Sequence, residues 1–226
     1  MNVVLFGATG MVGQGVLREC LLDPDVQRAV TVGRAPTGQR HPKLQEIVHA
    51  DLFDLSAIER DLTALDACFF TLGVTSAGMT EEQYTRITYD LTMAVAETLV
   101  RLNPRMTFVF VSGAGTDSSE HGRSMWARVK GKTENALLHM PFKSAYMFRP
   151  GFIQPMHGIR SRTKSYRVFY AITAPLFPIL RRLFPRLATT TEHLGRAMLA
   201  AAKHGAPEVV LDTAAINRLS ATIAPA

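Results

Sequence analysis

The chain has 226 residues, of which 47% are hydrophobic and 19% are charged, and its formal net charge at pH 7 is +6. This composition excludes a disordered chain, and the length suffices for one hydrophobic core, so we predict a single domain over residues 1–226. The basic excess lies late in the chain, since residues 136–190 contain no Asp or Glu, but no nucleic-acid-binding signature accompanies it and no nucleic-acid partner is expected.

The first fifteen residues predict a strand at 2–6, a glycine loop and an apolar helix at 11–22. In the loop GATGMVG, Gly7 permits the tight turn, Gly10 lets the backbone approach a pyrophosphate, and Gly13 lets the helix pack against the strand. The amides and dipole at the helix N-terminus would hold the phosphates. The predicted dinucleotide-binding residues of this segment are Gly7, Thr9, Gly10, Met11, Val12 and Gly13.

A second strand is predicted at 26–32, and Gly33 and Arg34 follow it. An acidic residue at this place would hold the ribose hydroxyls of NAD, whereas an arginine suits the 2′-phosphate of NADP. The sequence therefore favours NADP over NAD. In the alternative interpretation Arg34 is a solvated loop residue, and Arg40 and Lys43 are other candidate partners of the phosphate.

Strands and helices alternate through the next eighty residues. The predicted strands are 44–49, 67–72 and 106–111, and the predicted helices are 56–65, capped by Ser56 with Glu59, and 80–102, opened by a Thr80/Gln83 capping box. No connection resembles a hairpin, which predicts an α/β fold with a right-handed, doubly wound parallel sheet. Leu72 and Gly73 end one buried strand on the ligand-binding edge and are further cofactor candidates.

The segment GATGMVGQGVLREC resembles the opening of the atypical and extended short-chain dehydrogenase/reductase superfamily, and most closely the small NAD(P)-binding relatives of the NAD-dependent epimerase/dehydratases. The resemblance covers most of residues 1–151 and 191–211 and implies a Rossmann fold. It also implies that Asp51 contacts the adenine. An N-cap role for Asp51 in the following turn is the alternative.

In that superfamily a serine and a Tyr-x-x-x-Lys pair carry out proton transfer. Lys130 matches the lysine, which implies a catalytic role and contact with the nicotinamide ribose, but Trp126 stands at the tyrosine position. An indole N–H cannot act as an acid or base near neutral pH. The family register places the catalytic hydroxyl at Gly113, and Ser112 is the neighbouring candidate.

The chain thus has the cofactor-binding residues of the family site but lacks its usual proton-transfer residues. Three explanations of this difference remain open. Another acid substitutes, with His121 the best placed and Tyr84 or Tyr89 next. Alternatively, the reaction needs no acid from the protein, or the protein binds NADP without turnover. His121 can equally be a solvated loop residue.

The next strand is predicted at 142–148, and Arg149-Pro150-Gly151 resembles the family turn that lines the nicotinamide end of the pocket. Residues 152–190 are expected to form a variable region for substrate, lid or partner. Within it, 160–186 carries seven basic residues and an apolar run broken by prolines. A lid or substrate wall is the first interpretation, a partner surface the second and a membrane-surface segment the third. The seven basic residues would also suit an anionic small-molecule substrate.

The end of the chain predicts a helix from 191 to 204 that stops at Gly205, a short strand at 208–211 and a tail with one helical turn. The chain begins directly in a strand, which leaves no room for a signal peptide, and Cys20 and Cys68 are expected to be buried, so a cytoplasmic location is expected. The seven histidines are scattered and the two cysteines lie far apart, so no metal site is expected.

The leading functional hypothesis is an NADP-dependent oxidoreductase of atypical type that acts on a small molecule as a monomer or homodimer. Its rival is a non-catalytic NADP-binding redox sensor or protein-interaction module. An isomerase or dehydratase that uses the cofactor transiently is a third class.

Overall fold

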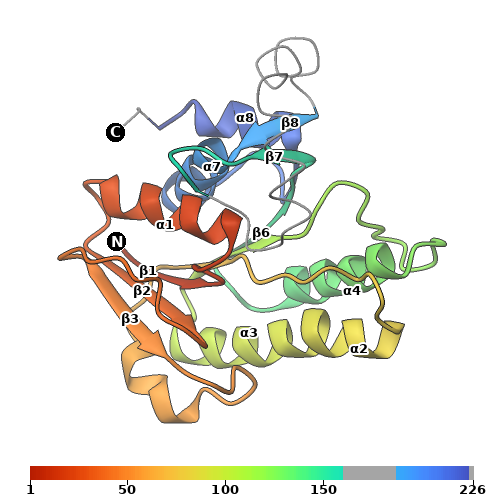
Figure 1. Cartoon of the computed structure of the whole chain (residues 1–226), viewed down its shortest axis with the longest axis horizontal. Coiled ribbons are helices and arrows are strands. Elements are labelled where there is room, and N and C mark those ends of the chain that lie inside the picture. The colour runs from red at the N-terminus through yellow and green to blue at the C-terminus, as the bar shows by residue number, and fades with distance from the viewer. Residues whose placement is uncertain (160–186, 224–226) are drawn as a thin grey trace.

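The computed structural model describes residues 1–159 and 187–223. Its centre is a seven-stranded, wholly parallel sheet with the strand order β3-β2-β1-β4-β5-β6-β9 (Figure 1). The strands are β1 Asn2–Phe6, β2 Arg28–Gly33, β3 Leu44–Val48, β4 Ala67–Phe70, β5 Thr107–Val111, β6 Ser144–Arg149 and β9 Val210–Asp212. The predicted doubly wound fold is confirmed.

Helices cover both faces of the sheet (Figure 1). One face carries α1 Met11–Leu22, α7 Thr191–His204 and α8 Thr213–Ser220. The other carries the 3₁₀ helix η1 Ser56–Leu62, the consecutive segments α2 Glu81–Thr85, η2 Arg86–Asp90 and α3 Leu91–Leu102, and α4 Met125–His139. A separate two-stranded parallel sheet pairs β7 Phe152–Gln154 with β8 Ala188–Thr190.

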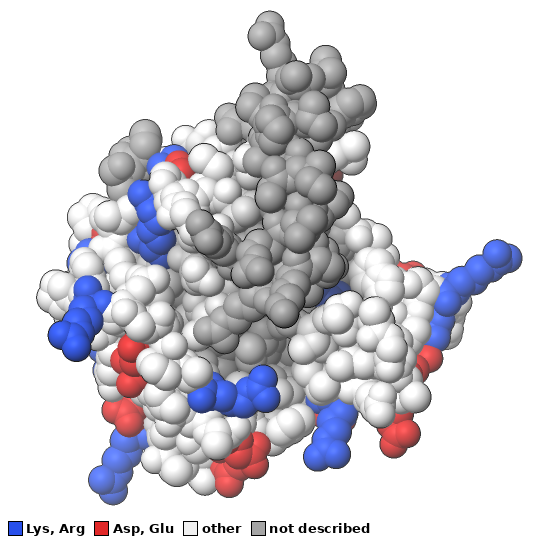
Figure 2. Space-filling model, viewed as in Figure 1, with Lys and Arg blue, Asp and Glu red and all other residues white. Residues whose placement is uncertain are grey.

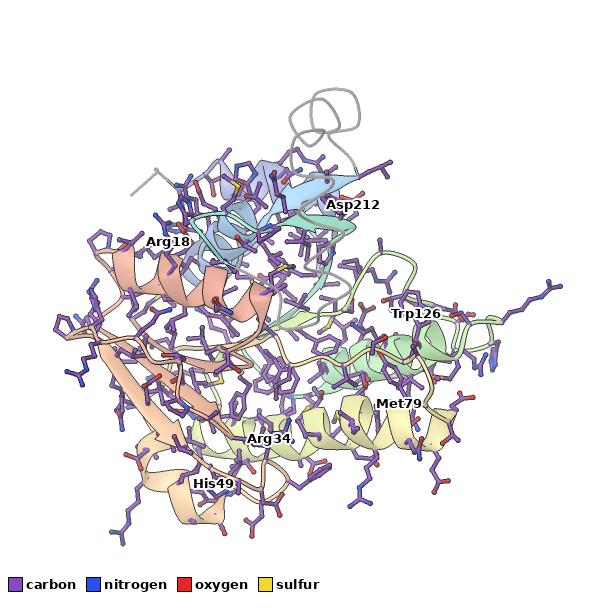
Figure 3. The ribbon with its side chains drawn as sticks, viewed as in Figure 1. Arg18, Arg34, His49, Met79, Trp126 and Asp212 are labelled. Carbon is purple, nitrogen blue, oxygen red and sulfur yellow. The ribbon has the colours of Figure 1, made fainter. Side chains whose placement is uncertain are left out.

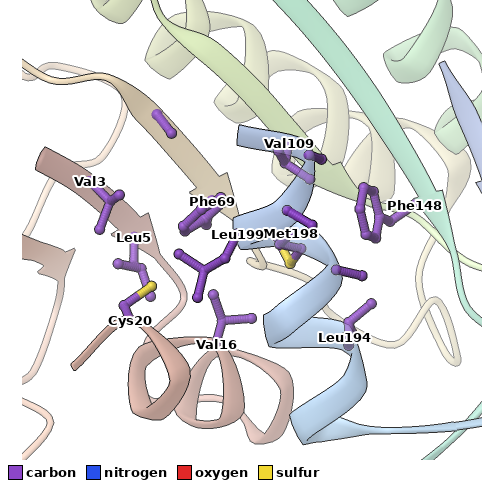
Figure 4. Close-up of a cluster of buried hydrophobic side chains, with 14 of the residues drawn as sticks. Val3, Leu5, Val16, Cys20, Phe69, Val109, Phe148, Leu194, Met198 and Leu199 are labelled. Atoms are coloured by element: carbon purple, nitrogen blue, oxygen red, sulfur yellow. The ribbon is translucent and has the colours of Figure 1, made fainter. Parts of the chain in front are cut away.

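The core is divided by the sheet, and alternate residues of each strand supply its two halves. Val3 and Leu5 of β1 face α1 and α7, together with buried side chains of those helices (Figure 4). Val4 and Phe6 of the same strand face the opposite side. Because both faces are covered, the central strands β1, β4 and β5 read as nearly continuous apolar runs rather than as alternating ones.

Close contact between α1 and α7 depends on two glycines. A Cβ built on Gly15 would lie 2.6 Å from the Cβ of Thr191, and one built on Gly195 would lie 2.8 Å from Cγ of Glu19. Glu19 is buried and accepts a hydrogen bond from Arg196 at 3.2 Å. Helix α7 has the bounds predicted from the sequence, 191–204, and Gly205 ends it with φ +81°.

The structure corrects several predicted elements. The helix predicted at 80–102 keeps its Thr80/Gln83 capping box, but a π-helical turn, η2, divides it into α2 and α3. The helix predicted at 56–65 is the shorter η1, and the Ser56 cap is wrong, because the Ser56 amide donates to Asp54 and no side chain caps the helix.

Strand and tail boundaries also differ from the predictions. The strand expected at 142–148 begins two residues later and includes Arg149, and the last strand begins at Val210. The tail forms the eight-residue helix α8, because the Asp212 side chain caps it by accepting from the Ala215 amide at 2.8 Å. The basic apolar segment 160–186 lies outside the described residues.

Cys20 and Cys68 are both fully buried and unpaired, and burial raises the pKa of each thiol. The described residues hold no cluster of three or more His, Cys, Asp or Glu that could bind a metal ion. Of the helices that the structure describes, none has the length and apolar character needed to cross a membrane.

Candidate functional site

The loop between β1 and α1 has a shape that only glycine permits at two positions. Gly7 has φ +90°, and a Cβ on it would lie 2.7 Å from the Leu72 nitrogen. A Cβ on Gly13 would lie 2.1 Å from the Gly7 carbonyl oxygen, so any side chain there would separate α1 from the loop. Gly10 has extended backbone and donates its N–H to that same oxygen at 2.9 Å.

The first turn of α1 is open to a ligand. Gly10 is its N-cap residue, no side chain caps it and no acidic residue lies in the turn. The amides of the first helical turn have no partners within the helix, and together with the helix dipole they favour an anion. Met11 and Val12 are half-exposed at this end.

A cavity of about 370 Å³ begins at this loop and extends across the carboxyl ends of β1, β2 and β4. Ligands of open parallel sheets bind at this edge. The cavity is lined by Gly7, Ala8, Thr9, Thr31, Val32, Gly33, Arg34, Ala35, Thr37, Leu52 and Leu72. Sequence reasoning named four of these eleven residues as cofactor-binding and missed the other seven. Thr31, Thr37 and Leu52 are among those missed, although they lie near the carboxyl ends of β2 and β3.

Arg34 is exposed at this cavity (Figure 3) and, within residues 1–159 and 187–223, takes part in no ion pair or side-chain hydrogen bond. The two other cations proposed from sequence are placed differently. Lys43 donates to the Asp23 carbonyl at 2.7 Å, and Arg40 is exposed and does not line the cavity.

Asp51 does not line the cavity. Its carboxylate accepts the Phe53 amide at 2.9 Å, which is the alternative turn role considered for it. Its neighbour Leu52 is buried and lines the cavity instead. Gly73 also lies outside the lining, whereas Leu72 belongs to it.

Beyond β5 lies a second polar cluster around a buried carboxylate, Glu134 of α4. Arg149 Nε donates to both carboxylate oxygens at 3.1 Å, and the Ser112 hydroxyl donates to one of them. Glu134 is 1% exposed. Sequence reasoning missed it, although its position four residues after Lys130 on one helix was a usable signal.

Lys130 reaches the same region from the preceding turn of α4. The residue as a whole is half-buried, and its amine donates to the Ser112 carbonyl oxygen. Burial lowers the pKa of Lys130 to about 8, against the opposing effect of the Glu134 carboxylate. The Ser112 hydroxyl is buried and already directed to Glu134 and to the Phe148 carbonyl, so it is not free to serve a substrate.

Trp126 lies in the first turn of α4 (Figure 3) and packs against the loop after β5. A Cβ on Gly115, which has φ +88°, would lie 3.3 Å from the indole. Gly113 has no described atom within 4 Å of such a position, so space remains where the family register would place the serine.

The three substitute acids lie in different environments. His121 is exposed in the loop before α4. Tyr84 is 2% exposed, and burial raises the pKa of its phenol. Tyr89 is half-buried with the Lys132 amine 4.3 Å from its ring centroid. The structure brings none of these three side chains to the described cavity.

The Pro150-Gly151 turn supports neighbouring backbone. The Pro150 carbonyl accepts the Ala114 amide at 2.9 Å, and the Gly151 amide donates to the Thr213 hydroxyl at 2.8 Å. A Cβ on Gly151 would lie 2.6 Å from the Leu187 carbonyl oxygen. These contacts hold the turn between β6 and β7 against the loop after β5 and the start of α8, and neither residue lines the described cavity.

Charged side chains of both signs are interspersed around the described part of the face in Figure 2. Cations there are not gathered into one continuous patch. The lining of the cavity includes one charged side chain, Arg34, whose guanidinium has no ion-pair partner among residues 1–159 and 187–223.

The glycine loop, the parallel sheet order and the cavity at its carboxyl edge define a Rossmann-type protein. The chain belongs to the NAD dependent epimerase/dehydratase family, whose model matches residues 3–129, more than half of the chain. The resemblance to an atypical relative of the short-chain dehydrogenases is confirmed.

Two curated relatives are similar to this chain. Protein fmp52, mitochondrial, of Emericella nidulans is 30% identical over 159 residues, which cover 67% of this chain and 66% of that protein, just under two thirds of its length. Protein FMP52, mitochondrial, of Saccharomyces cerevisiae is 28% identical over 191 residues, which cover 83% and 80%. These names contradict the cytoplasmic location expected from sequence, and that expectation is wrong.

Solved structures support the fold. The UDP-N-acetylglucosamine 4-epimerase of Methanobrevibacter ruminantium M1, in complex with UDP-N-acetylmuramic acid, has a TM-score of 0.67 at 15% identity and covers 97% of this chain and 80% of its own. The Bordetella bronchiseptica enzyme WbmF, in complex with NAD⁺, has a TM-score of 0.65 at 17% identity and covers 96% and 76%.

Proposed function

We propose that this chain binds NADP(H) in the cavity at the carboxyl ends of β1, β2 and β4 and acts as an oxidoreductase on a small molecule. The observation that carries the proposal is Arg34, an exposed guanidinium without a described partner, at the same cavity as the glycine loop. The family membership supports a nicotinamide cofactor, and the NAD⁺ complex of the structurally similar WbmF agrees with it.

The residues of the cavity and of the adjoining glycine loop and α1 N-terminus fit such a nucleotide. The uncapped first turn of α1 suits the pyrophosphate, and the missing Cβ of Gly10 leaves room for it. Leu52 and Val32 offer apolar contact for an adenine ring. Arg34 suits a 2′-phosphate, whereas an NAD-selective site would place an acidic side chain here.

A bound nicotinamide supplies hydride transfer. Lys130 is the residue of this chain that we propose to hold or move a proton, at its Nζ atom, because burial brings its pKa to about 8. The Ser112 hydroxyl is committed to Glu134 and the indole of Trp126 is no acid, so neither takes this role. An anionic substrate suits the basic composition of residues 160–186.

The second candidate function is an NADP-binding redox sensor or interaction module without turnover. Two observations favour it. The Ser112 hydroxyl is bonded to Glu134, and an indole that packs on Gly115 stands where the family has its tyrosine, so neither the serine nor a phenol is available for proton transfer. The two candidates share the same nucleotide site and differ only in chemistry.

Titration of the purified chain with NADPH and NADH tests the nucleotide site. We expect NADPH to bind more tightly than NADH. Arg34→Asp should weaken NADPH binding by at least about tenfold, because one charge-assisted contact to the phosphate is replaced by repulsion. Nicotinamide fluorescence and thermal unfolding measure the two affinities in parallel.

Arg40→Asp is the matched control, since it makes the same charge change nearby but outside the cavity lining. It should leave the preference for NADPH intact. If neither nucleotide binds the wild-type chain, the proposed site is wrong.

A further inference from the structure

The segment that carries Arg34 is held in shape by one carboxylate, Glu46 of β3. The Thr37 amide donates to Glu46 Oε1 at 2.6 Å, and the Thr37 hydroxyl donates to the same oxygen. The Gln39 amide in turn donates to the Thr37 hydroxyl oxygen at 3.2 Å. One acceptor atom thus organises the turn that follows Arg34.

The sheet register places Glu46 beside the cavity. Glu46 pairs with Thr31, and residues paired in register project to the same face of a sheet. Thr31 lines the cavity, as does Thr37, whereas Glu46 is absent from the lining. Glu46 therefore contacts the cavity rim through Thr37 and is not itself part of the lining.

We propose that Glu46 is a positioning residue for recognition of the nucleotide 2′-phosphate, because it fixes the 34–37 turn so that Arg34 is presented to the cavity. This inference rests on the proposed NADP(H) site. Pre-ordering the turn removes an entropic cost that binding of the phosphate would otherwise meet. A nucleotide without that phosphate makes no such contact with Arg34, so its affinity should not depend on how well this turn is ordered.

The test compares Glu46→Ala with Glu46→Gln in NADPH and NADH titrations of the full chain. Both variants remove the charge, but the glutamine oxygen can still accept from Thr37, so their difference isolates the hydrogen bonds. We expect Glu46→Ala to bind NADPH up to about tenfold more weakly than Glu46→Gln, the scale for losing one or two neutral hydrogen bonds. NADH affinity should be the same in both.

Gln45→Ala is the matched control. Gln45 neighbours Glu46 on β3, pairs with Val30 on the opposite face and donates to Asp61 at 3.0 Å, so its loss breaks a side-chain bond of the same strand away from the cavity. The NADPH preference should not change. Thr37→Val removes the hydroxyl bond and keeps the amide bond, and it should give a smaller shift in the same direction even if Glu46→Ala fails to fold.

The outcomes separate this inference from the proposed site. If the wild type prefers NADPH and Arg34→Asp abolishes that preference, but Glu46→Ala and Thr37→Val match Glu46→Gln, then only the positioning role is overturned. If Glu46→Ala weakens both nucleotides equally, Glu46 has a general structural role and the inference is also overturned. If the wild type binds neither nucleotide, both proposals fail.

Discussion

Lys130 combines burial with a titratable amine. The pKa of its amine falls from the ordinary 10.5 to about 8 because burial penalises the charged form. Between these two values the unfolded chain carries a proton that the folded chain has lost, so stability rises as pH increases from about 8 to about 10.5. Below pH 8 the folded protein carries the full cost of the buried charge.

Lys130→Met should remove this contribution. We expect the free energy of unfolding of the wild type to rise, relative to the variant, by up to about 3 kcal/mol between pH 8 and pH 10.5. Urea unfolding of both proteins across this pH range measures the difference. A constant difference would show that the Lys130 amine titrates normally.

Trp126 distinguishes an enzyme from a non-catalytic binding protein. Trp126→Tyr places a phenol four residues before Lys130, on the same helix face, where the amine lowers the phenol pKa and the phenol can donate a proton. We expect a gain of NADPH-dependent carbonyl reduction with small aldehydes and ketones, measured as loss of nicotinamide absorbance.

Trp126→Phe is the control, because it makes a similar change in size without an acid. If both variants reduced carbonyl compounds, the tyrosine phenol would not be the source of the gained activity. If Trp126→Tyr binds NADPH normally and stays inactive, the non-catalytic hypothesis gains support.

Helix α4 is tied to strand β6 by the ion pair between Glu134 and Arg149. The Arg149→Met variant leaves the 1%-exposed Glu134 without its cation, and we expect a loss of about 3–5 kcal/mol, the scale for breaking a buried pair from one side. Denaturant unfolding measures this loss.

Arg101→Met is the matched control in the same experiment. The Arg101 side chain is 58% exposed and pairs with Glu59, so its loss should cost at most about 1 kcal/mol. Equal effects of the two substitutions would contradict the structural role given to the α4–β6 pair.

Elements with a strong local signal were predicted well, and those that depend on packing were not. Apolar runs and a capping box located the strands and the start of α2. The π-helical turn η2 has no comparable signal, because residues 80–102 carry an uninterrupted helical pattern. The pairing of β7 with β8 joins residues 36 apart along the chain, as in Phe152 with Ala188, and such pairing depends on which segments the fold brings together.

At the scale of the whole molecule, one compact motif sets the positions of the rest. The glycine loop fixes α1 on β1, and the parallel sheet then collects the ends of β2 and β4 around the same cavity. α7, from the C-terminal part of the chain, packs against α1, so an element near the end of the sequence stabilises one near its beginning (Figures 1 and 4).

Sequence alone was enough to predict the doubly wound sheet, the glycine loop and the basic residue after β2, because these depend on local periodicity and on the steric needs of single residues. Which polar side chains are free to contact a ligand depends on the tertiary structure. The Ser112 hydroxyl donates to Glu134, 22 residues later in the chain, and the Thr37 hydroxyl donates to Glu46 of β3, nine residues later. Hydrogen bonds between residues distant in the chain leave no pattern in the sequence, since their partners meet only after the core has formed.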